Sequence, residues 1–299
     1  MNADSVKARL KNYAEENNRT FQEALVYYGL ERTIYRISVS RYADYFTLKG
    51  GIFLYALFKR NYARATTDID LRAIMLSNDR ENMKEVFSEI FSIEADDALI
   101  FDLKSLNVGD ISIENEYQGV NISIVAYLNR ARIPISIDIG FGDAIYPEAV
   151  EMDFPVLLDM DAPRIYAYSV ESVIAEKLEA TVSNGLLNSR YKDFYDIYML
   201  SLNFHFDEKK LSDAIIETFT QRGTTMSSNI AALTEEYYDD ITHKNRWNGF
   251  AKKKKAMVTV TIEETMMRIS DFLIPILTDI ENNNITSRTW NPQSGIWEK

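Results

Sequence analysis

Hydrophobic positions along the chain change their spacing twice. In residues 1–44 apolar side chains recur every three or four positions, which predicts amphipathic helices. In residues 45–166 several segments alternate apolar with polar residues, as strands with one buried face do. In residues 167–299 the helical spacing returns. The pattern therefore predicts an N-terminal helical cap, a lobe of mixed strands and helices, and a C-terminal helical lobe.

The middle lobe is expected to begin with a short strand that ends at two glycines. Phe46–Leu48 precedes the doublet Gly50-Gly51, and an apolar helix is expected over Ile52–Arg60. The segments Asp68–Ile74 and Ile133–Ile139 alternate as strands should. Because strands are mixed with helices here, we expect a lobe of the α/β or α+β class.

The C-terminal lobe holds one basic run and a polar tail. Four lysines, Lys252–Lys255, follow Trp247 and Phe250. Such a run is typical either of a solvated loop or of a surface that grips an RNA backbone. Residues 282–299 are rich in Asn, Thr, Ser and Pro, so we expect a loosely ordered tail.

Composition excludes several kinds of chemistry. The 299 residues include no cysteine and two histidines, so disulfides, thiolate metal sites, cysteine nucleophiles and histidine-rich zinc sites are excluded. The sequence contains neither a P-loop nor a glycine-rich dinucleotide-binding turn. Any catalysis must therefore come from carboxylates, hydroxyls, lysine, arginine and a metal ion that oxygen ligands hold.

Charge is distributed unevenly along the chain. The formal net charge is -12, and most of the acidic excess lies in residues 61–161. This argues against a protein that coats nucleic acid uniformly, but it allows local contact with an RNA end where a metal ion offsets the charge. The sequence shows neither an apolar signal core nor a run long enough to span a membrane. We therefore expect a cytoplasmic protein without a membrane partner.

Three aspartates form the candidate metal site. Asp68 and Asp70 stand two residues apart on a predicted strand, so both carboxylates project from the same face. Two carboxylates this close repel each other unless a divalent cation lies between them, and Mg²⁺ prefers such ligands. A third metal ligand is expected at Asp138, which could also help deprotonate an attacking hydroxyl. Asp143 is the weaker alternative.

The glycine doublet adds a place for a phosphate. Two glycines at the start of a helix let phosphate oxygens approach backbone N–H groups at the positive end of the helix dipole. Taken alone, an Asp-x-Asp pair is usually solvated charge and a Gly-Gly doublet is usually a turn. Their order along the chain, followed by a third aspartate on a strand, predicts a metal and nucleotide site.

Lys177 lies on the same helical stripe as the apolar residues Val173 and Ile174, so its stem is expected to point inward. An inward ammonium needs an anion, which could be a nucleotide phosphate or a nearby aspartate.

These motifs resemble a known family. A Gly-Gly doublet, a helix and an Asp-x-Asp pair look like the signature of DNA polymerase β type nucleotidyltransferases. More narrowly, Lys49–Gly51, Arg64–Leu71, Lys177 and Arg190–Asp196 resemble the AbiEii/AbiGii toxins of abortive-infection and toxin–antitoxin systems. The resemblance covers roughly residues 40–200 and implies an α+β, polymerase β-like lobe with a mixed sheet.

The resemblance also implies an activity. It implies a Mg²⁺-dependent transfer of a nucleoside monophosphate from a triphosphate such as GTP to an RNA acceptor, with the tRNA 3′ end as the expected target. It further implies antiviral defence and a cognate antitoxin, encoded nearby, that forms no tight complex with the toxin. Two alternatives stay open: nucleotidyl transfer to a hydroxyl of a protein or small molecule, and a non-catalytic nucleotide-binding module.

The candidate site residues fall into two groups by their expected role. The candidate catalytic residues are Asp68, Asp70, Asp138, Lys177 and Asp193. The candidate nucleotide contacts are Lys49, Gly50, Gly51, Arg64, Thr67, Arg190, Lys192 and Asp196. For the segment Arg190–Asp196 two interpretations stay open. Its charges form ordinary helix-surface ion pairs, or, as the resemblance implies, it faces the cleft and Asp193 orients Lys177 or the nucleotide.

Overall fold

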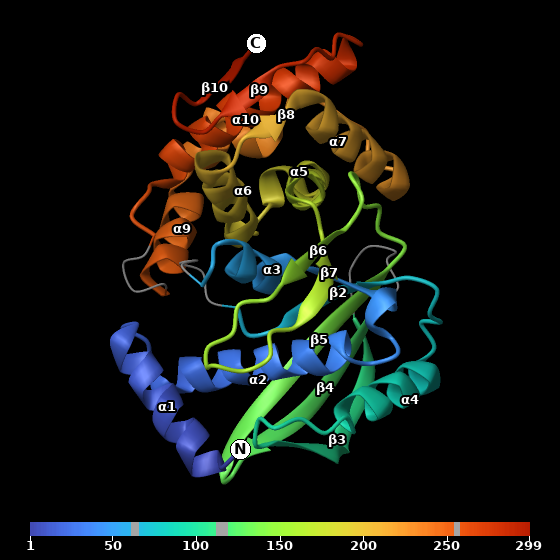
Figure 1. The fold of residues 1–299 in the computed structure, drawn as a ribbon. Coiled ribbons are helices and arrows are strands. Elements are labelled where there is room, and N and C mark those ends of the chain that lie inside the picture. The colour runs from blue at the N-terminus through green and yellow to red at the C-terminus, as the bar shows by residue number, and fades with distance from the viewer. Residues whose placement is uncertain (61–65, 112–118, 254–257) are drawn as a thin grey trace. The chain divides into compact units, whose positions relative to one another are not determined.

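The chain forms two compact units (Figure 1). The computed structural model describes residues 1–60, 66–111, 119–253 and 258–299. The first unit comprises Met1–Asp143 and Val150–Ala167, and the second comprises Ala144–Ala149 and Tyr168–Lys299. The N-terminal helices are part of the first unit. The boundaries expected from the sequence, 1–44, 45–166 and 167–299, stay a prediction.

A seven-stranded sheet forms the centre of the first unit. Its strands are β1 (Phe46–Lys49), β2 (Ile69–Ala73), β3 (Leu99–Ile111), β4 (Gly119–Leu128), β5 (Ala131–Phe141), β6 (Val150–Asp153) and β7 (Arg164–Ala167). Their order in the sheet is β3-β4-β5-β2-β1-β7-β6. The pairs β2–β5 and β1–β7 are parallel and the other neighbours are antiparallel. This mixed sheet with its helices confirms the predicted fold class.

One face of the sheet is apolar and covered by helices. The helices of this unit are α1 (Ala3–Glu16), α2 (Phe21–Ser38), α3 (Gly50–Leu57) and α4 (Arg80–Phe91), with a short 3-10 helix at Ala43–Tyr45. Alternate residues of β5, from Ile133 to Ile139, are buried, and α2 packs against this strand (Figure 1). Helix α4 packs against β3 and β4. The alternation read from the sequence therefore corresponds to one face in the core and one polar face.

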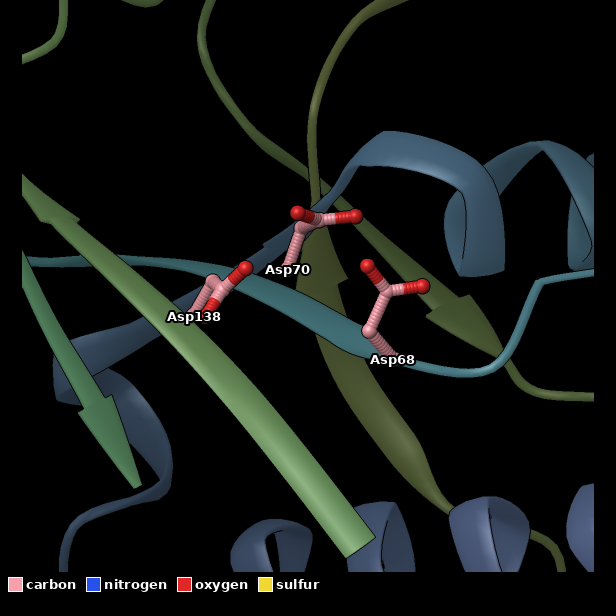
Figure 2. Close-up of side chains that lie close together, drawn as sticks. All are labelled: Asp68, Asp70 and Asp138. Carbon is pink, nitrogen blue, oxygen red and sulfur yellow. The ribbon is translucent and has the colours of Figure 1, made fainter. Parts of the chain in front are cut away.

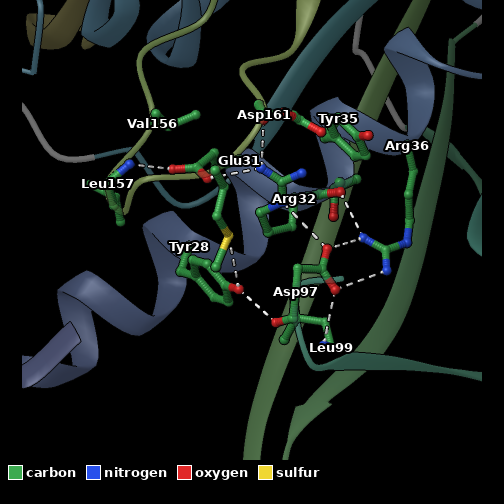
Figure 3. Close-up of polar contacts among 12 residues, drawn as sticks. Tyr28, Glu31, Arg32, Tyr35, Arg36, Asp97, Leu99, Val156, Leu157 and Asp161 are labelled. Atoms are coloured by element: carbon green, nitrogen blue, oxygen red, sulfur yellow. Dashed lines mark hydrogen bonds and ion pairs between the residues drawn. The ribbon is translucent and has the colours of Figure 1, made fainter. Parts of the chain in front are cut away.

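A buried network of charges holds α2 in place (Figure 3). The Arg36 guanidinium donates hydrogen bonds of 2.6 and 3.1 Å to Asp97, and Arg32 donates another of 3.3 Å. The Glu31 carboxylate accepts the Leu157 N–H at 2.6 Å. All four charged side chains are buried. Because losing one partner would leave a buried charge uncompensated, these contacts anchor α2 to the turn before β3 and to the segment after β6.

The second unit is mainly helical. Its helices are α5 (Val170–Asn184), α6 (Tyr191–Asn203), α7 (Glu208–Arg222), α8 (Glu235–Asp239), α9 (Ile241–Lys253) and α10 (Ile262–Glu281), with 3-10 turns at Gly185–Leu187 and Ala231–Leu233. Helix α5 packs on α7, and α6 packs on α10. In the described parts of both units, no helix combines the length and the apolar character needed to cross a membrane.

The expectation of a loose C-terminal tail is wrong. The strands β8 (Phe206–Asp207), β9 (Thr289–Asn291) and β10 (Ile296–Glu298) form a small sheet in the order β10-β9-β8. Trp290 is fully buried and its Nε1 donates to the Ser201 carbonyl at 2.7 Å, while Trp297 Nε1 donates to the Phe272 carbonyl at 2.9 Å. Two tryptophans thus anchor a segment that is otherwise mostly polar.

The basic run follows a buried aromatic residue. Trp247 is buried and its Nε1 donates to the Val260 carbonyl at 2.9 Å, so its ring is not presented to an RNA base. Lys252 is exposed, and Lys254 and Lys255 lie outside the described residues.

Stability near neutral pH is expected to depend on Glu31. Burial raises the pKa of Glu31 from 4.5 to about 7, although the Leu157 N–H and Arg32 partly offset this effect. The contribution of Glu31 to the free energy of unfolding is therefore fully present below its pKa in the unfolded chain. It is lost as the pH rises through its pKa in the folded protein. Glu31→Gln stays neutral at every pH. The difference in unfolding free energy between this variant and the wild type should therefore shift by about 2–3 kcal/mol in favour of the variant when the pH is raised from about 5 to about 8.

Urea unfolding of both proteins at the two pH values measures this gain. Glu85→Gln changes an exposed glutamate of α4 and serves as the control. A difference between Glu31→Gln and the wild type that stays constant with pH would contradict the prediction.

Candidate active site

Three carboxylates meet on one side of the sheet where β2 pairs with β5. In this parallel pairing Asp70 lies opposite Asp138, and Asp68 precedes Asp70 by two residues. Figure 2 shows the three side chains on the same side of the sheet. One ligand oxygen from each lies within 4.8 Å of the others, and all three residues are half-buried. The structure thus brings together the three aspartates that the sequence suggested as metal ligands, called the triad below.

Neighbouring donors restrain two of the carboxylates. Asp68 Oδ1 accepts the Thr66 hydroxyl at 2.9 Å and the Thr67 N–H at 3.2 Å. Asp138 Oδ1 accepts Asn121 Nδ2 at 2.6 Å, because β4 pairs with β5 so that Asn121 lies opposite Asp138. Sequence reasoning missed the roles of Thr66 and Asn121. The signal for Asn121 was a polar residue within the apolar alternation of its strand.

The glycine doublet lies against the third carboxylate. Gly50 has a φ of +65°, and a Cβ at this position would lie 2.0 Å from Asp70 Oδ2. The Gly51 N–H donates to the same oxygen at 3.3 Å. A side chain at position 50 would therefore collide with Asp70, in a backbone conformation that only glycine adopts easily.

The donor set of the triad fits a hard divalent cation. Carboxylate oxygens are the ligands that Mg²⁺ prefers, and three carboxylates at this spacing repel one another unless a cation offsets their charge. In the part of the chain that the structure describes, no other group of three acidic, histidine or cysteine side chains is close enough to hold a metal ion.

The second unit contains Lys177 and the predicted charges of the segment Arg190–Asp196. Lys177 Nζ of α5 lies 2.7 Å from Asp193 Oδ1 and 2.7 Å from Asp196 Oδ2 of α6. Arg190 Nε also donates to Asp193. Burial alone would raise the pKa of Asp193, but Lys177 and Arg190 lower it well below its usual range. Asp193 and Asp196 are thus buried partners of Lys177, and their catalytic and nucleotide-binding roles stay predictions.

The remaining predicted nucleotide contacts differ in their exposure and their partners. The side chains of Thr67, Arg190 and Lys192 are exposed, whereas Asp196 is buried. Lys49 forms an ion pair with Asp143. Arg64 lies outside the described residues.

Replacing Gly50 by alanine is expected to disrupt the triad. The new methyl group would displace the Asp70 carboxylate, so Mn²⁺, a spectroscopic substitute for Mg²⁺, should bind about 10- to 100-fold more weakly. Electron paramagnetic resonance of Mn²⁺ measures the affinity. Gly109→Ala is the matched control, because a Cβ there meets nothing within 4 Å. Equal Mn²⁺ affinity in the two variants would show that Gly50 does not shape the site.

Removing the Lys177 ammonium is expected to destabilise the second unit. Lys177→Met leaves two buried carboxylates without their cation, which should cost about 3–5 kcal/mol of unfolding free energy. Lys192→Met, on the exposed side of α6, should change it by less than about 0.5 kcal/mol. Urea unfolding distinguishes the two, and similar values for both variants would refute the buried pairing.

No curated protein matches the chain. Among solved structures it is similar to a nucleotidyltransferase candidate from H. pylori, with 13% identity, a TM-score of 0.45, and coverage of 86% of this chain and 93% of that chain. It is also similar to JHP933 from Helicobacter pylori, with 15% identity, a TM-score of 0.45, and coverage of 85% and 92%.

The family is shown by a match over most of the chain. The model of the family described as nucleotidyl transferase AbiEii toxin, type IV TA system, matches residues 32–263. This agrees with the resemblance of the glycine doublet and the Asp-x-Asp pair. The chain is therefore a nucleotidyltransferase and belongs to the AbiEii family of toxins from type IV toxin–antitoxin systems.

Proposed function

We propose that the protein is a Mg²⁺-dependent toxin that transfers a nucleoside monophosphate from a nucleoside triphosphate to an RNA hydroxyl. The observation that carries the proposal is the triad, whose ligand oxygens lie within 4.8 Å of one another. Family membership supports nucleotidyl transfer and implies a nucleotide substrate and an antitoxin partner. GTP as the donor and the tRNA 3′ end as the acceptor complete the proposal.

The proposed reaction is a displacement at the α-phosphorus. The oxygen of the acceptor hydroxyl forms a bond to this phosphorus, the bond to the bridging oxygen of the β-phosphate breaks, and pyrophosphate leaves. Mg²⁺ held by Asp68, Asp70 and Asp138 would offset the charge of the phosphate oxygens. The Asp138 carboxylate is the proposed acceptor of the hydroxyl proton.

Gly50 and Gly51 would allow the triphosphate to approach the backbone at the start of α3. Neither glycine carries a side chain that would block this approach at the point where β1 ends beside Asp70. The ammonium of Lys49, the last residue of β1, would contact the phosphates. These roles make the doublet part of nucleotide binding as well as of the triad's geometry.

An RNA 3′ end is an acceptor that is compatible with the uneven distribution of charge along the chain. Most of the acidic excess lies in residues 61–161, which contain the triad. An RNA that approached this region broadly would be repelled, whereas a single 3′ end needs only local contacts and a metal ion. We propose that modification of such an end arrests growth in antiviral defence, and that the antitoxin counteracts it without a tight complex.

The test follows labelled nucleotide into its acceptor. The purified chain is incubated with each α-³²P-labelled triphosphate, Mg²⁺ and either total tRNA or a cell lysate. We expect label on tRNA, with GTP as the best donor. Asp70→Asn should reduce the rate by at least about 100-fold, because it removes a charge from the proposed metal site.

Asp153→Asn, an exposed aspartate of β6, is the matched control and should retain full activity. Label on protein or on a small molecule instead of RNA would replace the proposed acceptor. No transfer at all, with growth arrest unchanged by Asp70→Asn, would mean that the chain acts as a nucleotide-binding module.

A further inference from the structure

A largely buried ion pair lies next to the triad in the first unit. Lys49 Nζ lies 2.5 Å from Asp143 Oδ2, and the two side chains are 17% and 7% exposed. Lys49 is opposite Asp70 in the pairing of β1 with β2, so both residues project from the same face of the sheet. The pair is therefore a neighbour of the triad rather than a remote structural contact.

The shape of β5 makes room for the Asp143 carboxylate on this face. Gly140 follows Asp138 by two residues, so a side chain at position 140 would point to the same side as the triad. A Cβ there would lie 3.0 Å from Asp143 Oδ2 and 3.6 Å from Lys49 Nζ. The absence of a side chain at Gly140 thus lets Asp143 and Lys49 meet over the sheet.

Asp143 also contacts a second basic residue of the same face. Arg72 follows Asp70 by two residues in β2 and is opposite Gly140 in β5. Its Nε donates to the Asp143 backbone carbonyl at 2.6 Å. One residue therefore binds an ammonium through its carboxylate and a guanidinium through its carbonyl, both beside the triad.

We propose that Asp143 is a positioning residue of the nucleotide site, which holds Lys49 and Arg72 in place to bind the triphosphate. This rests on the proposed function in taking a nucleoside triphosphate as the ligand. A lysine has a long flexible stem, and a fixed carboxylate partner reduces the freedom that it loses when a phosphate binds. Because the cost of burying both charges offsets much of their attraction, the pair is weak evidence for a stabilising role, and its place beside the triad favours a positioning one.

A purely electrostatic effect of Asp143 and a positioning effect predict opposite changes in triphosphate affinity when its charge is removed. Asp143 is an anion close to the proposed phosphate site, so removing its charge should strengthen the binding of a polyanion if only electrostatics mattered. If Asp143 positions the cations, removing its charge should weaken that binding. The sign of the change therefore separates the two explanations.

The experiment measures the binding of inorganic triphosphate with Mg²⁺ to the full chain by calorimetry. Asp143→Asn and Lys49→Gln should each weaken binding about tenfold. The double variant should bind like Lys49→Gln alone, because Asp143 acts largely through Lys49. Mn²⁺ affinity at the triad should stay within about twofold of the wild type in Asp143→Asn, because its fold and metal ligands are retained. Asp153→Asn is again the control.

Several results would overturn the proposal. Triphosphate binding to Asp143→Asn that is unchanged or tighter would do so, as would the absence of triphosphate binding to the wild type. A double variant whose loss of affinity is the product of the two single losses, or a loss of Mn²⁺ affinity in Asp143→Asn, would also contradict it. If Asp143→Asn does not fold, Asp143→Glu, which displaces the charge by one methylene, takes its place in the same comparison. Since the probe contains no base and no acceptor, failure of RNA labelling and failure of this proposal are distinguishable.

Discussion

The parallel pairing of β2 with β5 is the constraint on which the candidate site depends. Side chains alternate between the two faces of a strand, so this register places Asp70 beside Asp138 and buries Ile69 and Ile137 on the other face. A slip of one residue would bury the carboxylates and expose the isoleucines. Because burying unpaired charge is costly, the packing of the core and the geometry of the site are decided together.

A group of carboxylates that repel one another needs a rigid support. The apolar face of the sheet packs under α2, which Arg36 and Asp97 hold to the turn before β3. On the polar face, Asn121 holds Asp138, and Gly50 leaves room for Asp70. The AbiEii site thus combines a packed core on one side with short, directional contacts on the other, and we interpret this as preorganisation for a metal ion and phosphates.

Much of the fold could be predicted because local properties of the chain decide it. Apolar spacing predicted helices within residues 1–44, where α2 lies, and the alternating strand that corresponds to β5. The shared face of Asp68 and Asp70 also follows from two-residue spacing alone. The helix expected over 52–60 instead begins at Gly50 and ends at Leu57, because helix ends depend on the conformation of the flanking residues.

Tertiary structure alone decided which distant residues meet. Asn121 reaches Asp138 only because β4 pairs with β5, and nothing in the local sequence specifies that partner. In the same way, the tail is ordered because Trp290 finds a buried place beside Ser201, although its neighbours in sequence are polar. Periodicity and motifs therefore identified the elements and the chemistry of this protein. Strand pairing and side-chain burial, which depend on contacts far apart in sequence, determined the geometry of the site.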